Sequence, residues 1–139
     1  MAFEHQTTVL FSQVDSVGIV FFARAFEYCH ETLEAMLLAG GMPLHSILDG
    51  GDWAMPLVHA EADYKRPMRL GDRLTVRVDI EKLGPGSITF AYTILSEAGE
   101  TRATAKLVHA VIDRKRFKAR RVPQAAIDAF RRAGLTVPE

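Results

Sequence analysis

One carboxylate, Asp15, lies where it could do chemistry. In the stretch QVDSVGIVFF (13–22), Gly18 follows it by three residues and an apolar run follows the glycine. The residues from Ile19 onward predict a helix, and the first turn of a helix has unpaired N–H groups and partial positive charge. Such an end can polarise a carbonyl oxygen, and a nearby carboxylate can act as nucleophile or as base on water. The alternative is that Asp15 or Ser16 only caps the helix or a turn.

The polar face of the expected helix carries further candidates. His30 and Glu34 lie one helical turn apart, and Glu27 is within reach of both. A metal site normally needs three or four converging ligands, and the other histidines show no recognisable spacing. We therefore expect no metal, and we interpret this face as solvent-exposed.

The sequence neighbours of three other reactive side chains indicate structural roles. His59 and His109 each lie between apolar neighbours in expected strands, where a partly buried structural histidine is usual, although His59 could line a pocket. Cys29 falls on the apolar stripe of the helix, which is typical of a small core residue. The chain has no G-x-S-x-G, G-x-G-x-x-G, phosphate-loop or H-E-x-x-H motif.

The elements that position these residues follow from hydrophobic periodicity. Apolar side chains three and four apart predict one long helix over about 19–39, closed by Gly40 and Gly41. Alternating patterns predict strands over 3–11, 54–66, 72–83, 87–97 and 101–115. The segment 42–53 predicts a short helix or a turn, and 122–134 predicts a short helix.

Tight turns between consecutive strands predict antiparallel pairing, and one long helix against such a sheet is an α+β layer arrangement. A chain of 139 residues can bury a core of its own, so we expect residues 1–139 to form one domain.

Charge and composition exclude several classes of protein. Lys+Arg and Asp+Glu are balanced at 17 each, which gives no reason to expect nucleic acid or a membrane surface as partner. A basic run at 113–121 has only Phe117 for base stacking, so it is either a solvated strand end or a patch for the phosphates of a small ligand. One cysteine fits a reducing cytoplasm. We expect no signal peptide and no membrane-spanning segment.

Two motifs, in this order, resemble one family. VDSVGIVFFARAFEYCHETLEAML (14–37) resembles the D-x-x-G-[IV]-[VI]-[FWY]-[FY] signature and following helix of hot-dog-fold acyl-CoA thioesterases of the 4-hydroxybenzoyl-CoA thioesterase family. PLVHAEADYKRPMRLGDRLTV (56–76) resembles the family's extended strand followed by R-P and G-D. The CHE of the helix and HAEADYKRP of the strand look like the 1,4-dihydroxy-2-naphthoyl-CoA thioesterase branch. The similarity runs from about residue 11 to residue 123.

The resemblance implies a curved antiparallel sheet wrapped around one long central helix, and hydrolysis of an acyl-CoA thioester without metal or cofactor. Asp15 would take the position of the catalytic carboxylate, as nucleophile or as general base. The backbone N–H near Phe22 would polarise the thioester carbonyl, and Gly18 would permit the tight turn between acid and helix. The expected acyl pocket is lined by His59, Phe21 and His30.

The resemblance also implies assembly. Family members pair their sheets edge to edge into dimers, often as dimers of dimers, with active sites at subunit interfaces. We therefore expect a cytoplasmic homotetramer.

One departure concerns CoA. The 4-hydroxybenzoyl enzyme carries basic residues for the CoA phosphates in the segment that here reads KLGPGS, which contains only Lys82. The expected contacts are therefore Lys65, Arg66 and Arg69 together with Lys82, or the 114–121 cluster. CoA or an acyl-carrier protein could carry the acyl group.

Two rival functions remain. A hot-dog hydratase or dehydratase would act on an acyl thioester, but its usual Asp/His motif is not found. A non-catalytic acyl-CoA or acyl-carrier binding module would not need a carboxylate beside the thioester.

Overall fold

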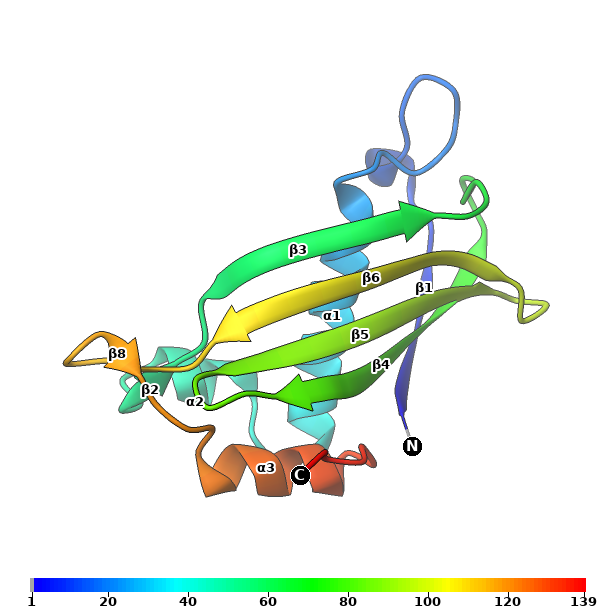
Figure 1. Cartoon of the computed structure of the whole chain (residues 1–139). Helices are drawn as coiled ribbons and strands as arrows, with labels where there is room; N and C mark the ends of the chain where they lie inside the picture. Colours follow the sequence, from blue (N-terminus) through cyan, green and yellow to red (C-terminus); the bar gives the residue numbers. More distant parts are fainter. Residues whose placement is uncertain (1) are drawn as a thin grey trace.

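A computed structural model describes residues 2–139. Its main layer is a five-stranded antiparallel sheet in the order β1-β4-β5-β6-β3. Helix α1 (Arg24–Ala39) crosses one face of this curved sheet (Figure 1). The α+β prediction is therefore confirmed. The strands are β1 (Phe3–Thr8), β3 (Leu57–Tyr64), β4 (Arg73–Leu83), β5 (Ser87–Ser96) and β6 (Thr101–Ala110).

The core lies between α1 and the sheet. The predicted helical stripe is buried at Cys29, Leu33, Met36 and Leu37. The predicted alternation in β4 is confirmed, because its inward side chains are buried while their neighbours are partly exposed. Each fully buried aliphatic side chain contributes roughly 1.5–3 kcal/mol, so this two-sided pattern fixes which face of each element turns inward. The inward side chains of β4 are Leu74, Val76, Val78 and Ile80.

The periodicity predicts that the long helix begins at about Ile19. In the structure, helix α1 begins at Arg24. Ile19 and Val20 instead form isolated bridges with other loop residues, and the N–H of Phe21 donates to the carbonyl oxygen of Gln13. Apolar residues at 19–22 fit the helical stripe by type, but their backbone hydrogen bonds belong to the loop. The C-terminal end at Gly40 is as predicted.

Two predicted strands are each divided. The segment 101–115 becomes β6 and β7 (Ile112–Asp113), because the N–H of Val111 leaves the ladder and donates to Gly86. The segment 54–66 becomes β2 (Trp53–Ala54) and β3, separated at Pro56, which has no N–H to donate. The segments β2, β7 and β8 (Lys118–Ala119) form a small second sheet.

Short helices complete the fold. The predicted helix over 122–134 is confirmed as α3 (Gln124–Arg132), and the segment 42–53, predicted as a helix or a turn, contains α2 (Leu44–Leu48). The first predicted strand ends at Thr8, and a 3-10 turn, η1 (Phe11–Gln13), leads to the Asp15 loop. Within residues 2–139, no helix is long and apolar enough to cross a membrane.

Candidate active site

Asp15 is held at the head of a tight turn. Its Oδ1 accepts the N–H of Val17 at 2.8 Å and that of Ile19 at 3.4 Å. The N–H of Gly18 donates to the Asp15 carbonyl oxygen at 3.0 Å, and Gly18 has φ +84°, where a side chain would be strained. The N-cap of α1 is Ala23, without a side-chain hydrogen bond. Asp15 therefore caps this turn and not the helix.

The second carboxylate oxygen of Asp15 is available. Its Oδ2 has no hydrogen-bond partner among residues 2–139, and the residue is exposed. The two bonds to Oδ1 fix the orientation of the carboxylate, so Oδ2 can meet a substrate or water in one defined direction.

A cavity of about 420 Å³ lies beside Asp15. One wall comes from the Asp15 loop, including Phe21 and Phe22, and the other from the end of β3 and the turn that follows it. Two expected CoA contacts, Lys65 and Arg66, lie in this second wall. The fold thus brings together segments that are about 50 residues apart in the sequence, as their numbers show.

The backbone at Phe22 is held by a contact that sequence reasoning missed. The Tyr64 hydroxyl donates a hydrogen bond to the Phe22 carbonyl oxygen. Burial and the nearby Cys29 raise the pKa of Tyr64, which keeps this hydroxyl protonated as a donor. The Phe22 N–H has no partner within the described residues. Tyr64 lies within the family motif at 56–76, but the motif does not reveal this contact, because only the folded sheet carries Tyr64 to the loop.

A second contact ties the loop to α1. The Tyr28 hydroxyl donates to Oε1 of Gln13 at 2.7 Å, and the N–H of Leu10 donates to the same oxygen at 2.9 Å. Burial, with Glu31 and Glu27 nearby, raises the pKa of Tyr28 to about 12. The loop that carries Asp15 is therefore fixed to the buried face of the helix.

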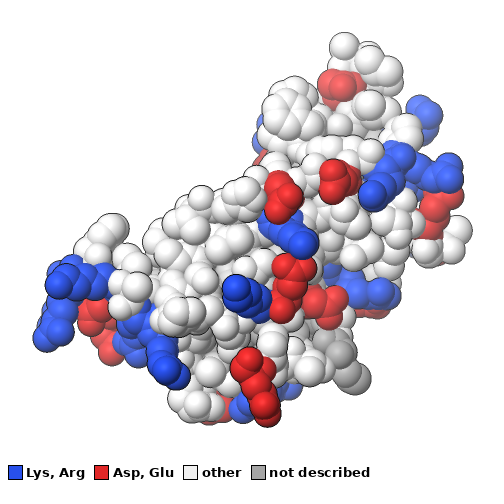
Figure 2. All heavy atoms as spheres, viewed as in Figure 1, with Lys and Arg blue, Asp and Glu red and all other residues white. Residues whose placement is uncertain are grey.

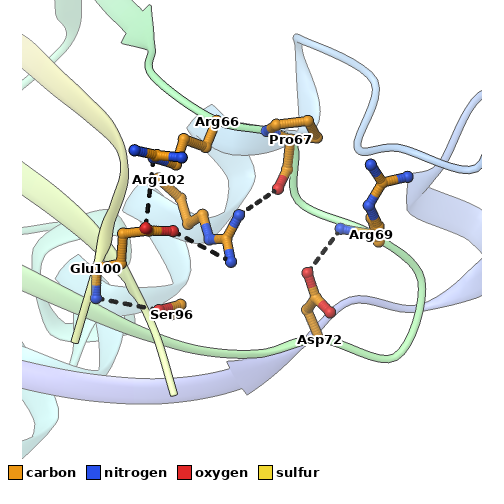
Figure 3. A network of polar contacts seen from close by, with 7 residues as sticks. All are labelled: Arg66, Pro67, Arg69, Asp72, Ser96, Glu100 and Arg102. Carbon is orange, nitrogen blue, oxygen red and sulfur yellow. Dashed lines mark hydrogen bonds and ion pairs between the residues drawn. The ribbon is translucent and has the colours of Figure 1, made fainter. Parts of the chain in front are cut away.

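The basic residues after β3 form a supported turn, shown in Figure 3. Arg102 donates to the carbonyl oxygen of Pro67 at 3.1 Å and pairs with Glu100 at 3.4 Å, while Arg66 pairs with the same glutamate at 3.4 Å. The Arg69 N–H donates to Asp72, and the Arg69 guanidinium points away from that carboxylate.

Lys82 lies elsewhere, opposite Thr89 near the end of β4, and lines neither the Asp15 cavity nor the larger one described next.

A larger cavity of about 770 Å³ has mostly apolar walls. It is built from α1, α2, β2, the link between β2 and β3, the end of β6 and the hairpin that begins with β7. Among the described residues, it shares no lining residue with the Asp15 cavity. His30 lines this larger cavity, and so does His109. Sequence reasoning missed the larger cavity because its walls come from segments far apart in the chain.

The predicted acyl-pocket residues are not together in one chain. Phe21 lines the Asp15 cavity and His30 the larger one. His59 pairs with Val108 on the sheet face away from α1, lies 3.4 Å from Glu61 and lines neither cavity.

The other candidate side chains have structural surroundings. Cys29 is fully buried, and burial raises the pKa of its thiol to about 12, so the reactive thiolate is not available. Glu27 pairs with Arg24 at 2.7 Å. Within residues 2–139, no three His, Cys, Asp or Glu side chains are grouped as metal ligands. His109 is buried, as expected of a structural histidine.

Comparison with known proteins agrees with this architecture. The family model of the Thioesterase-like superfamily matches residues 9–130. The 1,4-dihydroxy-2-naphthoyl-CoA hydrolase of Synechococcus elongatus is 33% identical over 127 residues, covering 91% of this chain and 93% of that protein.

Solved structures give the same result. The 1,4-dihydroxy-2-naphthoyl-CoA thioesterase of Synechocystis is 30% identical with a TM-score of 0.87, covering 94% of this chain and 96% of that one. A Staphylococcus aureus protein in complex with CoA is only 17% identical, with a TM-score of 0.82 over 100% and 90% of the two chains, and shows the fold alone. The resemblance stated from the sequence is confirmed: the chain has the hot-dog fold and belongs to the Thioesterase-like superfamily.

Proposed function

We propose that this protein hydrolyses an acyl-CoA thioester to the free acid and CoA, with Asp15 as the catalytic carboxylate. One observation carries the proposal: Asp15, which has a free Oδ2, and Phe22, which has an unpaired N–H, line the same cavity. A thioester needs both groups, a donor for the carbonyl oxygen and a carboxylate for the attack. The two relatives named above, each at least 30% identical, bear names of thioester-hydrolysing enzymes, which supports the proposal.

The chemistry follows one of two routes. The Phe22 N–H polarises the carbonyl, and then either Asp15 attacks the carbonyl carbon or Asp15 removes a proton from an attacking water. In the first route a mixed anhydride forms and water cleaves it; in the second the acid forms directly. In both, the C–S bond breaks, the CoA thiolate leaves, and a proton from water ends on the thiol. Both routes require the ionised Asp15 carboxylate.

The β3 strand supplies the surface for the proposed dimer. It is the edge of the five-stranded sheet, and nearly all of its residues are exposed. An exposed edge strand with apolar side chains such as Leu57 and Val58 tends to pair with another strand. Antiparallel pairing of two copies of β3 about a two-fold axis would extend the sheet across both copies.

Such a pairing would complete the active site. Antiparallel strands place the Tyr64 end of one copy beside the Leu57 end of the other. The first end adjoins the Asp15 cavity, and the second adjoins the larger apolar cavity through Met55 and Pro56. We therefore place the reacting carbonyl at Asp15 of one copy and the acyl group in the larger cavity of its partner.

The proposed acyl group is aromatic. The larger cavity has the volume and apolar walls of a small-molecule site, and the relatives named above act on a naphthoyl thioester. The 4-hydroxybenzoyl group is the smaller alternative. His30 lines this cavity within one chain, whereas His59 can reach an acyl group only if a neighbouring copy builds the pocket around it.

The proposed CoA contacts lie at the basic turn after β3. Lys65 and Arg66 line the Asp15 cavity, and Arg69 follows in the same turn. In Figure 2, Lys and Arg side chains gather at two ends of the face in view. One group is in the region where β3 ends, and the other in the region of the β7–β8 hairpin. Arg114 of that hairpin lines the larger cavity, so it would approach the composite site from the partner.

Three wider expectations belong to this proposal. Residues 1–139 act as one thioesterase domain, which the match over residues 9–130 supports. Two dimers associate into a homotetramer, which light scattering measures directly. The protein works in the cytoplasm, where its single buried thiol needs no disulfide partner.

A thiol-release screen tests the proposed function. The panel contains 1,4-dihydroxy-2-naphthoyl-CoA, 4-hydroxybenzoyl-CoA, and short- and long-chain acyl-CoAs, each also offered on an acyl-carrier protein. The expected result is turnover that is fastest with an aromatic acyl-CoA. Hydration of an enoyl-CoA without thiol release would favour the hydratase, and tight binding without any turnover would favour the binding module.

A further inference from the structure

We propose that the larger cavity selects an aromatic acyl group bearing a ring hydroxyl, and that this hydroxyl donates a hydrogen bond to Nε2 of His109. The inference rests on the proposed hydrolysis of aromatic acyl-CoA thioesters and names the feature of the substrate that the site distinguishes. It follows from four properties of the structure: the tautomer of His109, its unpaired nitrogen, the walls of the cavity and the exposed ring of His30 beside that of His109.

The ring of His109 is fixed in one tautomer. Its Nδ1 lies 2.8 Å from the carbonyl oxygen of Met55. A carbonyl oxygen only accepts hydrogen bonds, so Nδ1 carries the proton. Burial lowers the pKa of His109. The hydrogen bond to Met55 opposes this by raising the pKa, and the nearby His30 lowers it. The ring is therefore neutral at pH 7, and Nε2 presents a lone pair.

This lone pair has no partner. Nε2 makes no hydrogen bond within the described residues, and His109 is 5% exposed. Phe90 packs edge-on against the ring, with centroids 5.7 Å apart, and offers no donor. A buried acceptor without a donor costs free energy, and native structures seldom keep one without a reason. A hydroxyl of a bound ligand would supply the missing donor.

The cavity beside His109 suits an uncharged ring. Its walls include Phe26, Leu33 and Ile47, and its volume of about 770 Å³ falls in the range of ~300–1,000 Å³ for small-molecule sites. Three carboxylates of α1 also line it, those of Glu27, Glu31 and Glu34, against the one guanidinium of Arg114, so negative charge prevails. Negative charge at these positions repels an anionic group on the acyl ring, so a neutral hydroxyl is the donor that fits.

His30 is the neighbouring ring on the cavity wall. Nε2 of His109 is shielded from water, and the exposed ring of His30 packs against the His109 ring, with centroids 5.9 Å apart. Both histidines line the cavity. Because exposed side chains change rotamer within nanoseconds, His30 can rotate away as the ligand enters. The hydroxyl then takes its place against His109.

Binding of 2-naphthol and naphthalene to the full-length protein, measured by titration calorimetry, tests the inference without depending on turnover. We expect about tenfold tighter binding of 2-naphthol, the effect of one added hydrogen bond. Two variants form a matched pair. His109→Asn keeps an amide donor for Met55 but lacks the distant acceptor, so the preference should disappear. His109→Gln can place an amide oxygen near the Nε2 position, so part of the preference should remain.

The same comparison with thioesters connects binding to turnover. The wild-type kcat/KM should be about tenfold higher for 1-hydroxy-2-naphthoyl-CoA than for 2-naphthoyl-CoA, and His109→Asn should treat them alike. Because the variants can lose stability, nitrogen-15 NMR of the wild-type protein is a second test, in which 2-naphthol should shift the Nε2 resonance of His109.

Three results would overturn the inference: equal binding of the two ligands by the wild type, a preference that survives in His109→Asn, or an unmoved Nε2 resonance at saturating 2-naphthol. The proposed function fails separately. Selective 2-naphthol binding with no thiol release from any thioester would refute hydrolysis and support the cavity, whereas equal hydrolysis of both naphthoyl thioesters would refute only the cavity's selectivity.

Discussion

At the scale of single residues, each polar group at the site has a physical reason for its state. One oxygen of Asp15 caps a turn while the other is free. Tyr64 fixes the backbone beside the unpaired N–H of Phe22, and Met55 sets the tautomer of His109. The site therefore combines a few fixed hydrogen bonds with a few groups left open for a substrate.

Tyr64→Phe tests the support of the Phe22 turn. Losing one hydrogen bond of ~0.5–1.5 kcal/mol should lower kcat about tenfold, because the Phe22 N–H is then less well aimed at the carbonyl. We expect KM to change little, since the phenyl wall remains. Steady-state kinetics measure both constants, and an unchanged kcat would show that the Tyr64 bond does not position the donor.

His109 should make stability depend on pH. Its folded-state pKa is lowered from 6.5 by burial, so the unfolded chain takes up the proton first as the pH falls. Stability is then fully present above about pH 6.5 and is lost as the pH falls below that value towards the folded pKa. Urea unfolding from pH 8 to pH 5 measures the slope. His109→Asn should flatten it, and identical slopes would contradict the assignment.

At the scale of elements, the close contact of α1 with α3 depends on Gly40. A Cβ at this position would collide with the carbonyl of Ala129, and Arg132 donates to the Gly40 carbonyl oxygen at 2.7 Å. The helix end and α3 can therefore approach closely only because residue 40 has no side chain.

Gly40→Ala should destabilise the fold. The collision involves backbone, which yields less easily than a side chain, and overpacking of this kind costs about 1–3 kcal/mol. Chemical unfolding measures the free energy of unfolding. The control Leu38→Ala, at an exposed position of α1, should stay within ~0.5 kcal/mol of wild type. A Gly40→Ala variant as stable as that control would show that the helices separate without cost.

Most elements were predictable from the sequence because their periodicity reports burial directly. The alternation in β4 and the stripe from Cys29 to Leu37 are examples. The start of α1 was not predictable, because the apolar residues at 19–22 fit a helical pattern although their backbone groups pair within a loop.

The site was predictable in part. The Asp15–Gly18 spacing pointed to the turn, and the motifs pointed to thioester chemistry. Tyr64 and the open nitrogen of His109 could not be found in advance, because their roles depend on contacts 42 and 54 residues away along the chain.

At the scale of the whole molecule, one chain holds the two halves of the proposed site in separate cavities. In the proposed dimer, pairing along β3 would bring Asp15 of one copy beside the larger cavity of the other. Turnover would then require the dimer.

Ala60→Asp tests this requirement. Ala60 is exposed near the middle of β3, opposite Leu107 on the face towards α1, so pairing would bring two added charges together. We expect sedimentation to show a folded monomer with at least tenfold lower activity. The control Leu38→Asp adds the same charge at an exposed position away from β3. It should leave the assembly intact. An active monomer would refute the composite site.

The most direct test of the central claim is thiol release by Asp15→Asn beside wild type, with the best aromatic acyl-CoA of the screen. The amide keeps the shape and can still accept the turn's hydrogen bonds, but it has no negative charge for attack or proton removal. The account predicts normal folding and assembly with turnover reduced by about 10²–10⁴-fold. Turnover close to wild type in Asp15→Asn would contradict it.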